Sequence, residues 1–340
     1  MTFPIDVMGS GGVLLGAHIV CDGFHRDRRF RVQTHVHDDH MADFNTSKGF
    51  QNLFMSVETY TLLAAEFDAD LPVRDNITSL GYGVPRDIGC GQLTLFPSDH
   101  MLGAVQVRIE TESGTRLGYS GDFQWPMEQP MEVDALVVDS TYGSPESIRQ
   151  YTQEEAEVRF LELIFAKLKR GSIHIRAHRG TVQRAVRILS GEIDVPILCS
   201  RRLTEEIGVY QQFGSAVGSV LGVGTPEAKV AVGDRRYVRL YSKGDKFPDQ
   251  LPEGTTVILS AFMARPDDPV LEYSERSYRV ALSNHADFLG TLEYVRATKA
   301  KYVVADNTRG RGVELAQEIR TRLRIPAVPS TNIHRHEWGL

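Results

Sequence analysis

Apolar residues in the first 140 positions come in short runs, separated by polar and glycine-rich turns. Runs of four to eight residues bounded by turn signals are typical of strands. An eleven-residue segment with apolar positions at helical spacing interrupts them at 57–67. We therefore predict one helix there and strands at 11–15, 17–21, 31–34, 92–97, 105–110, 116–120 and 135–139.

The pattern changes after residue 150, where strands begin to alternate with helices. Thr152 precedes an amphipathic helix to Lys169, and Glu155 three residues on completes a capping box. The remaining pattern predicts strands at 172–176, 196–199, 256–260, 277–282 and 301–305, and helices at 181–190, 203–213, 288–298 and 312–322. The stretch 217–234 is interpreted as a strand with loops and 267–276 as a loop. This βαβ rhythm favours an α/β fold, with the alternating part inserted into one domain.

The composition is that of a soluble globular protein, with 41% hydrophobic and 24% charged residues. No apolar run approaches the roughly 20 residues that cross a membrane, and residues 1–6 lack the pattern of a secretory signal. Cys21, Cys90 and Cys199 are too widely spaced for a disulfide framework or a cysteine zinc site. We expect a cytoplasmic protein with free thiols.

Charge is distributed unevenly along the chain. The net charge of −6 argues weakly against nucleic acid, yet residues 165–212 contain nine Lys and Arg against four Asp and Glu. On charge alone a solvated helix face explains this stretch best.

The segment Thr34–Met41 carries the most specific chemistry of the chain. It reads Thr-His-Val-His-Asp-Asp-His-Met, with His35, His37 and His40 beside Asp39. Imidazole nitrogen and carboxylate oxygen are ligands of Zn²⁺-like cations. After a strand, His35 and His37 point the same way because side chains alternate, while Asp39 and His40 lie beyond that alternation. The H-x-H-x-D-H pattern therefore indicates a hydrolase loop that serves two metals.

Further ligand-type side chains follow other predicted strands, where they would be rigidly held. They are His100, Asp122, Asp139 and His285. Each is weak evidence alone, but with the histidine loop they complete two ligand sets.

In order and spacing, Asp22, the His35–His40 loop, His100, Gly121-Asp122 and Asp139-Ser140-Thr141-Tyr142-Gly143 resemble the metallo-β-lactamase-fold nucleases. Asp139–Gly143 and Ser283-Asn284-His285-Ala286-Asp287 resemble motifs of their β-CASP branch, which processes nucleic acids. Arg176–Arg184 and Ser260–Met263 are most similar to ligase-associated DNA exonucleases, and 122–142 to the Artemis-related crosslink-repair nucleases.

This resemblance implies a four-layer αββα metallo-β-lactamase sandwich with an inserted α/β β-CASP cap. The expected boundaries are 1–167 and 273–340 for the sandwich and 168–272 for the cap.

The resemblance also assigns roles to the ligand set. His35, His37 and His100 would hold one metal, Asp39, His40 and His285 the other, and Asp122 would bridge them. Asp22 would orient a ligating histidine, and Asp139 would help to position His285 or the scissile phosphate. Four of these residues are expected to take part in catalysis: Asp39, Asp122, Asp139 and His285. Zn²⁺ is the first expectation for both ions, with Mn²⁺ or Mg²⁺ as alternatives.

One departure affects the substrate. Many β-CASP enzymes carry a further histidine after the next strand. At the matching place this chain has Asp306, which is expected to support the metal ligands without binding an ion itself. The crosslink-repair DNA nucleases also lack that histidine, so its absence favours DNA over RNA. Phosphates are expected to bind the helix start at Gly180-Thr181 and the cations Arg176, Arg179 and Arg184.

We therefore expect a metal-dependent DNA exonuclease acting on single strands or ends in DNA repair, with a ligase or helicase as a partner. The alternatives are a ribonuclease of the same fold, a small-molecule hydrolase and an inactive nucleic-acid-binding scaffold.

Overall fold

The computed structural model describes residues 3–66, 70–247, 254–261 and 265–331. The chain forms two compact units, one of Met1–Ile148 with His285–Leu340 and one of Arg149–Asn284. We call them the first unit and the inserted unit. The inserted unit begins before residue 168 and ends after residue 272, so it is larger than the predicted cap. That it is a β-CASP cap stays a prediction.

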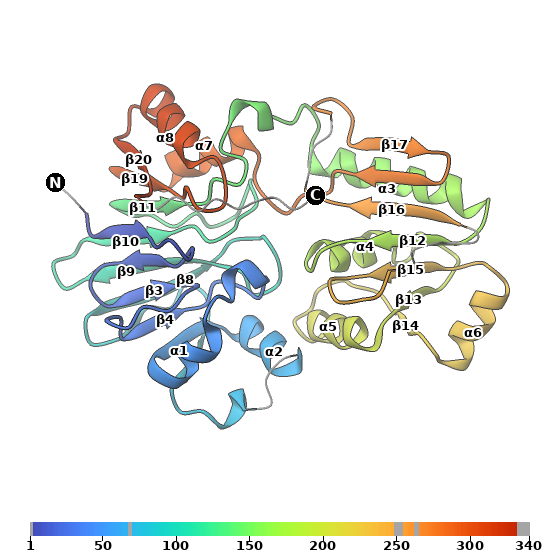
Figure 1. Ribbon diagram of the computed structural model, residues 1–340, viewed down its shortest axis with the longest axis horizontal. Helices are drawn as coiled ribbons and strands as arrows, with labels where there is room; N and C mark the ends of the chain where they lie inside the picture. Colours follow the sequence, from blue (N-terminus) through green and yellow to red (C-terminus); the bar gives the residue numbers. More distant parts are fainter. Residues whose placement is uncertain (1–2, 67–69, 248–253, 262–264, 332–340) are drawn as a thin grey trace. The chain divides into compact units, whose positions relative to one another are not determined.

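Two mixed sheets form the first unit (Figure 1). One has the order β1-β2-β3-β4-β5-β6, with strands Ile5–Val7, Val13–Leu15, Ile19–Cys21, Phe30–Val32, Asn52–Ser56 and Ile77–Leu80. The other has the order β20-β19-β11-β10-β9-β8-β7, with strands Ala327–Pro329, Tyr302–Ala305, Ala135–Val138, Arg116–Tyr119, Val105–Thr111, Gly91–Pro97 and Arg86–Asp87.

A single apolar cluster joins these two sheets. Val13 and Leu15 from the first sheet and Leu95, Val107 and Leu117 from the second all belong to it, and all are buried. Side chains on one face of a strand recur every second residue, so each sheet turns one apolar face toward this shared core.

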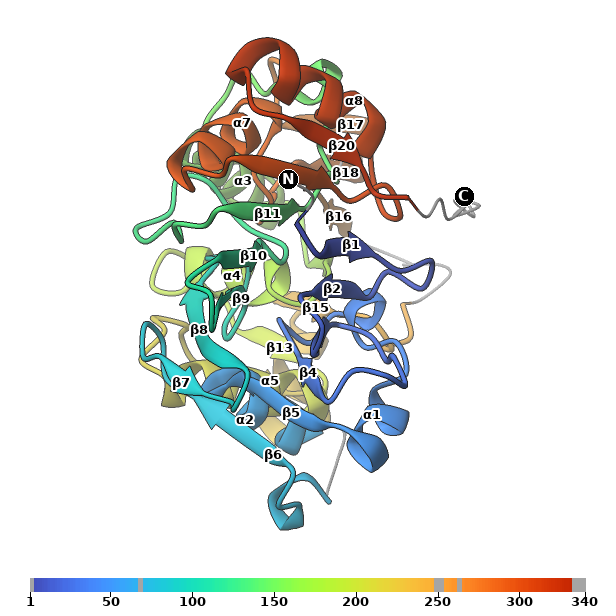
Figure 2. The ribbon, with the colours of Figure 1, turned by 90° about the vertical axis from the view of Figure 1, so that its left-hand side faces the viewer.

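A second core lies between the larger sheet and the helices drawn beside β19 and β20 in Figure 2. It unites Leu136 of β11 and Val303 of β19 with apolar residues of α7 (Phe288–Ala297), α8 (Gly312–Glu318) and the following π-helical turn Ile319–Leu323. The helices α1 (Phe44–Phe50) and α2 (Val57–Glu66) contact β5 of the smaller sheet. The four-layer description itself stays a prediction.

The inserted unit is built on a third sheet, of order β14-β13-β15-β12-β16-β18-β17. Its strands are Leu221–Gly222, Ile197–Cys199, Val238–Tyr241, Ile173–Arg176, Thr255–Leu259, Ser277–Val280 and Val270–Ser274. All neighbours are parallel except β17 and β18. Its helices are α3 (Gln153–Leu168), α4 (Thr181–Leu189), α5 (Arg201–Gln212) and α6 (Pro226–Gly233).

The α/β class is confirmed, and the predicted capping box is present at the start of α3, where Thr152 and Glu155 bond each other's backbone N–H. Two local predictions were wrong. The stretch 217–234 contains α6, and the predicted loop 267–276 contains the edge strand β17. Phe262 and Met263, part of one motif, lie outside the described residues. No helix in the described ranges is both long and apolar enough for a membrane span.

Gly121 shows how tightly the core holds the loop that carries Asp122. Its φ is +57°, and a Cβ there would lie 2.5 Å from the carbonyl oxygen of Val105 in β9. Only glycine meets both demands, because it adopts positive φ without strain and leaves room for the neighbouring backbone.

We expect Gly121→Ala to destabilise the protein more than Gly114→Ala. Gly114 also has positive φ, +79°, but a Cβ there meets no atom within 4 Å. Both variants lose about 1 kcal/mol from backbone strain, and Gly121→Ala loses about 1–3 kcal/mol more from the clash. Denaturant unfolding of both variants measures the difference, and equal losses would contradict this account.

Candidate metal centre

The histidine loop follows β4 and ends in a 3-10 turn, Asp38–His40. His35 and His40 are fully buried, whereas the Asp39 side chain is 57% exposed. The loop therefore turns most of its imidazoles inward and leaves the carboxylates of Asp38 and Asp39 at the surface.

The other ligand-type residues come from four separate segments of the first unit. His100 follows β8, Asp122 follows β10, Asp139 follows β11, and His285 precedes α7. Because β10 and β11 are parallel neighbours, their carboxyl ends place Asp122 and Asp139 at the same sheet edge.

His35, His37, His100 and Asp122 form one cluster, and their nearest ligand atoms all lie within 4.8 Å of one another. His37 Nδ1 is 3.1 Å from His35 Nε2 and 3.2 Å from His100 Nε2. Asp122 Oδ2 is 3.7 Å from Nε2 of both His35 and His100. Four ligands bound tetrahedrally at 2.0–2.1 Å lie about 3.4 Å apart, so these spacings fit one ion such as Zn²⁺.

The chemistry of this cluster also fits a cation. Three ring nitrogens converge on one point, and each neutral imidazole carries only one proton, so hydrogen bonds alone cannot satisfy them all. Burial, together with the neighbouring His40 and His37 rings, holds the pKa of His35 well below its ordinary value. His35 is therefore neutral, the form that binds metals.

Asp122, Asp139 and His285 form a second cluster of ligand atoms. His285 Nε2 lies 3.9 Å from Asp122 Oδ2, and its Nδ1 lies 3.5 Å from Asp139 Oδ2. The loop adds His40, whose Nε2 is 3.2 Å from Asp122 Oδ1 and 3.5 Å from Asp39 Oδ2. Asp122 thus faces His35 and His100 with one oxygen and His40 with the other.

Charge is concentrated around Asp122. Burial alone would raise the pKa of this carboxyl, but the His40, His285 and His35 rings lower it well below its usual range. Burial and Arg309 lower the pKa of His40, but Asp122, Asp39 and Asp22 outweigh them and raise it to about 10. The carboxylates therefore attract positive charge to this point, and a divalent ion could replace the proton on His40 Nε2.

Asp22 fixes the orientation of His40. It is fully buried, accepts the backbone N–H and hydroxyl of Thr34 at 2.8 and 2.6 Å, and lies 2.7 Å from His40 Nδ1. With Nδ1 donating to this carboxylate, His40 presents Nε2 to Asp122, where an ion could take the place of the Nε2 proton. Asp139 lies similarly beside His285, and its Oδ1 accepts from the backbone N–H and hydroxyl of Thr141.

Asp306 belongs to neither cluster. Its buried Oδ1 accepts the backbone N–H and hydroxyl of Thr308 at 2.8 and 2.6 Å. It shapes the turn after β19, and this turn carries Arg309, whose guanidinium lies against His40.

Arg31 and Gln33 hold the backbone of the histidine loop by hydrogen bonds, and neither residue was predicted to belong to the site. The fully buried Arg31 donates to the carbonyl oxygens of His40 and Ala42, and Gln33 Nε2 donates to those of His35 and His40. Arg31 Nη2 also donates to Gln33 Oε1 at 2.6 Å. A signal was present, because both residues fall on one face of an otherwise apolar strand.

The predicted phosphate contacts lie in the inserted unit, and two of them already have acidic partners. Arg179 Nη2 is 3.3 Å from Glu206 Oε1, and Arg184 Nε is 2.7 Å from Glu157 Oε1. Gly180 caps α4 with φ +79° and donates its N–H to Gln183 Oε1. Thr181 is buried and Arg176 is exposed. Their contacts with nucleic acid stay a prediction.

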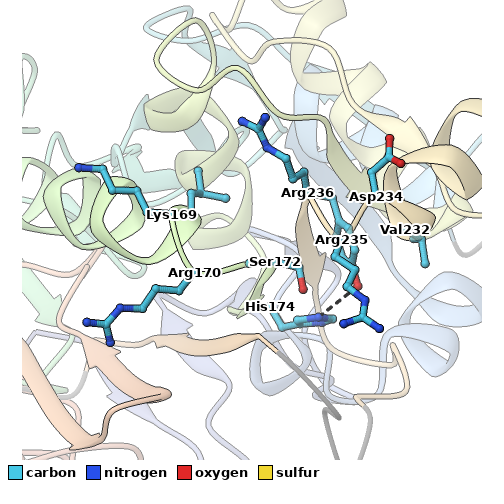
Figure 3. A pocket seen from close by; sticks show the side chains of 11 residues that line it. Lys169, Arg170, Ser172, His174, Val232, Asp234, Arg235 and Arg236 are labelled. Carbon is cyan, nitrogen blue, oxygen red and sulfur yellow. Dashed lines mark hydrogen bonds between the residues drawn. The ribbon is translucent and has the colours of Figure 1, made fainter.

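The inserted unit also has a cavity of about 670 Å³ (Figure 3). Lys169, Arg170, Arg235 and Arg236 line it, with His174 and Tyr237. Positive charge near a helix end stabilises the last carbonyls; Lys169 and Arg170 directly follow α3, and Arg235 and Arg236 follow α6 after Asp234. Their gathering therefore needs no ligand to explain it.

Several known proteins are similar to this chain in sequence. A protein of Acidianus ambivalens named "Uncharacterized protein in lig 3'region" is 31% identical over 138 residues, which cover 40% of this chain and 98% of that protein. No protein-family model matches the chain.

Other relatives match in part. "Transcription termination factor FttA" of Pyrococcus abyssi is 32% identical over 158 residues, 42% of this chain and 24% of that protein. The "RNase J-like protein" of Methanocaldococcus jannaschii is 26% identical over 175 residues, 46% of this chain and 41% of that protein. These matches span less than half of either relative.

A match along nearly the whole chain comes from the "Probable DNA ligase" of Opitutus terrae, 21% identical over 94% of this chain but only 30% of that protein. The crystal structure of a protein of unknown function from Enterococcus faecalis V583 shares the fold, with a TM-score of 0.58 at 14% identity over 83% of this chain and 76% of that one.

We expect Asp22→Asn to lower the metal affinity of the centre by about 10–100-fold, because an amide no longer fixes the His40 tautomer. Asp87→Asn, on an exposed strand end, serves as the control and should bind metal as the wild type does. Competition with a chromophoric chelator measures the affinity. Unchanged affinity in Asp22→Asn would contradict the proposed role of Asp22 in orienting His40.

Proposed function

This chain belongs to the same family as the Acidianus ambivalens protein "Uncharacterized protein in lig 3'region", and we propose that it is a metal-dependent nuclease that hydrolyses phosphodiester bonds. The observation that carries the proposal is the convergence of His35, His37, His100 and Asp122 at spacings that fit a bound ion. The adjoining Asp39, His40, Asp139 and His285 supply donors for a second ion.

The relatives support nucleic acid as the substrate. FttA and the RNase J-like protein align with this chain over 158 and 175 residues. One is named a transcription termination factor and the other RNase J-like, so both names point to nucleic acid, in line with the resemblance of the Asp139 and His285 motifs to the β-CASP branch. A small-molecule hydrolase has no comparable support from these relatives.

We propose DNA as the preferred substrate, attacked at single strands or ends during repair. The relative that aligns over 94% of this chain is named a probable DNA ligase, and Asp306 replaces the histidine of many RNA-processing members. A ligase is accordingly the partner we favour. The RNase J-like relative makes RNA the second candidate.

Each side chain has a part in the proposed hydrolysis. Divalent ions in such a centre lower the pKa of a water molecule and neutralise the negative phosphate. His35, His37, His100 and Asp122 would hold one ion, and Asp39, His40, His285 and Asp122 the other. Asp22 keeps the proton of His40 on Nδ1, and Asp139 faces Nδ1 of His285, so that each Nε2 is directed toward Asp122. Asp122 is ionised and can accept a positive partner on each oxygen.

We expect the wild-type protein with Mn²⁺ or Zn²⁺ to shorten 5′-labelled single-stranded DNA, and a chelator to stop it. His37→Ala should lose on the order of a hundredfold or more, because the ring nitrogen shared between His35 and His100 is gone. His18→Ala, which removes an exposed imidazole, should keep full activity. Product lengths on denaturing gels give the rates.

The same assay with RNA of matched sequence decides the substrate. Cleavage of RNA alone would replace DNA by the second candidate. Full activity of His37→Ala, or turnover of a thioester but of neither nucleic acid, would refute the proposed nuclease.

A further inference from the structure

Arg309 places a permanent positive charge inside the proposed metal centre. It lies on the turn between β19 and α8, and only 11% of its side chain is exposed. Its Nη1 is 3.2 Å from His40 Nδ1 and 3.1 Å from His40 Nε2. The guanidinium therefore touches the ring of a proposed ligand.

The two nearly equal distances define where the guanidinium lies. A group in the ring plane and equally far from both nitrogens would collide with the carbon between them, so Nη1 lies over the face of the imidazole. His40 Nδ1 is already directed at Asp22, and Nε2 lies 3.2 Å from Asp122 Oδ1. Arg309 thus leaves the in-plane position at Nε2 accessible to an ion and adds a permanent positive charge next to it.

The surrounding backbone is shaped to keep Arg309 there. Its Nη2 donates to the carbonyl oxygens of Asp39 and Gly11, at 2.8 and 3.3 Å. A Cβ on Gly11 would lie 2.8 Å from Nη2, and a Cβ on Gly310 would lie 2.2 Å from the carbonyl oxygen of Ser140. Any other residue at either glycine would push the turn or the guanidinium away.

The guanidinium is not neutralised by one dedicated partner. Its Nε is 4.0 Å from Asp39 Oδ2, a proposed metal ligand, and the carboxylates of Asp306 and Asp122 also attract it. Arginine cannot lose its proton in a protein, so a cation entering between Asp39 and His40 meets a like charge a few ångströms away.

We infer that Arg309 sets the metal stoichiometry, opposing a second divalent ion at Asp39 and His40 while the His35–His37–His100–Asp122 cluster binds the first ion tightly. This inference rests on the proposed metal centre. Arg309 would act through the charge that it places beside His40 and Asp39, since its guanidinium is too covered to hold a substrate directly.

The test is a Zn²⁺ titration of chelator-treated full-length protein, followed by calorimetry and by elemental analysis after gel filtration. The wild type should bind one equivalent tightly and a second at least about tenfold more weakly. Arg309→Met removes the charge at similar side-chain length and should reduce the difference in affinity between the first and second ions by about tenfold or more. Arg309→Lys keeps the charge and should leave that difference near its wild-type value.

Arg311→Met is the matched control, because Arg311 is two residues away, 58% exposed and paired with Glu314. It should bind zinc as the wild type does. Should Arg309→Met fail to fold, as judged by its thermal transition without metal, Arg309→Gln replaces it, since the neutral amide can still donate to the Asp39 carbonyl.

The outcomes separate the two proposals. Two equally tight ions in the wild type, or an unchanged or larger affinity difference in the neutral variants, would overturn the role of Arg309 and leave the metal centre standing. A wild-type protein that takes up no ion would instead refute the metal centre itself.

Discussion

The proposed metal centre of the first unit depends on the buried carboxylate of Asp122, which the fold brings close to four histidines. One buried carboxylate faces His35 and His100 with one oxygen and His40 with the other, and His285 lies nearby. Burying so many polar groups costs free energy unless each finds a partner. A divalent cation between the donors would offset that cost for several side chains at once, so the cluster favours bound positive charge.

Such a cluster needs a rigid frame that keeps its side chains in place when no cation is bound. The two sheets supply the frame through their shared core, and the parallel pair β10 and β11 brings Asp122 and Asp139 to one edge. Arg31 and Gln33 then hold the loop backbone by its carbonyl oxygens, a task that the apolar core cannot perform. The polar network beneath the loop is therefore as much a part of the centre as the ligands.

The sequence predicts the parts of this centre that are local and misses those that depend on the third dimension. Strand β11 and the capping box of α3 are clear because burial and capping leave a direct pattern. β17 is an edge strand with exposed residues, so it shows no apolar alternation. The Val residues of α6 suggested a strand, although Thr225 and Pro226 offer a helix start. Arg309 is nearly 270 residues from His40, and no spacing rule connects them.

The ion pairs of the inserted unit show why its number of basic residues overestimates the charge available to bind nucleic acid. Residues 165–212 carry an excess of cations, yet Arg179 and Arg202 face Glu206, and Arg184 and Arg187 share Glu157. Arg184 also donates to the carbonyl oxygen of Ser283, directly before the segment that supplies His285. A guanidinium held by several partners in this way would lose them on turning to a phosphate. These paired arginines therefore stabilise the inserted unit. The exposed Arg176 is a better candidate for contact with nucleic acid than Arg184.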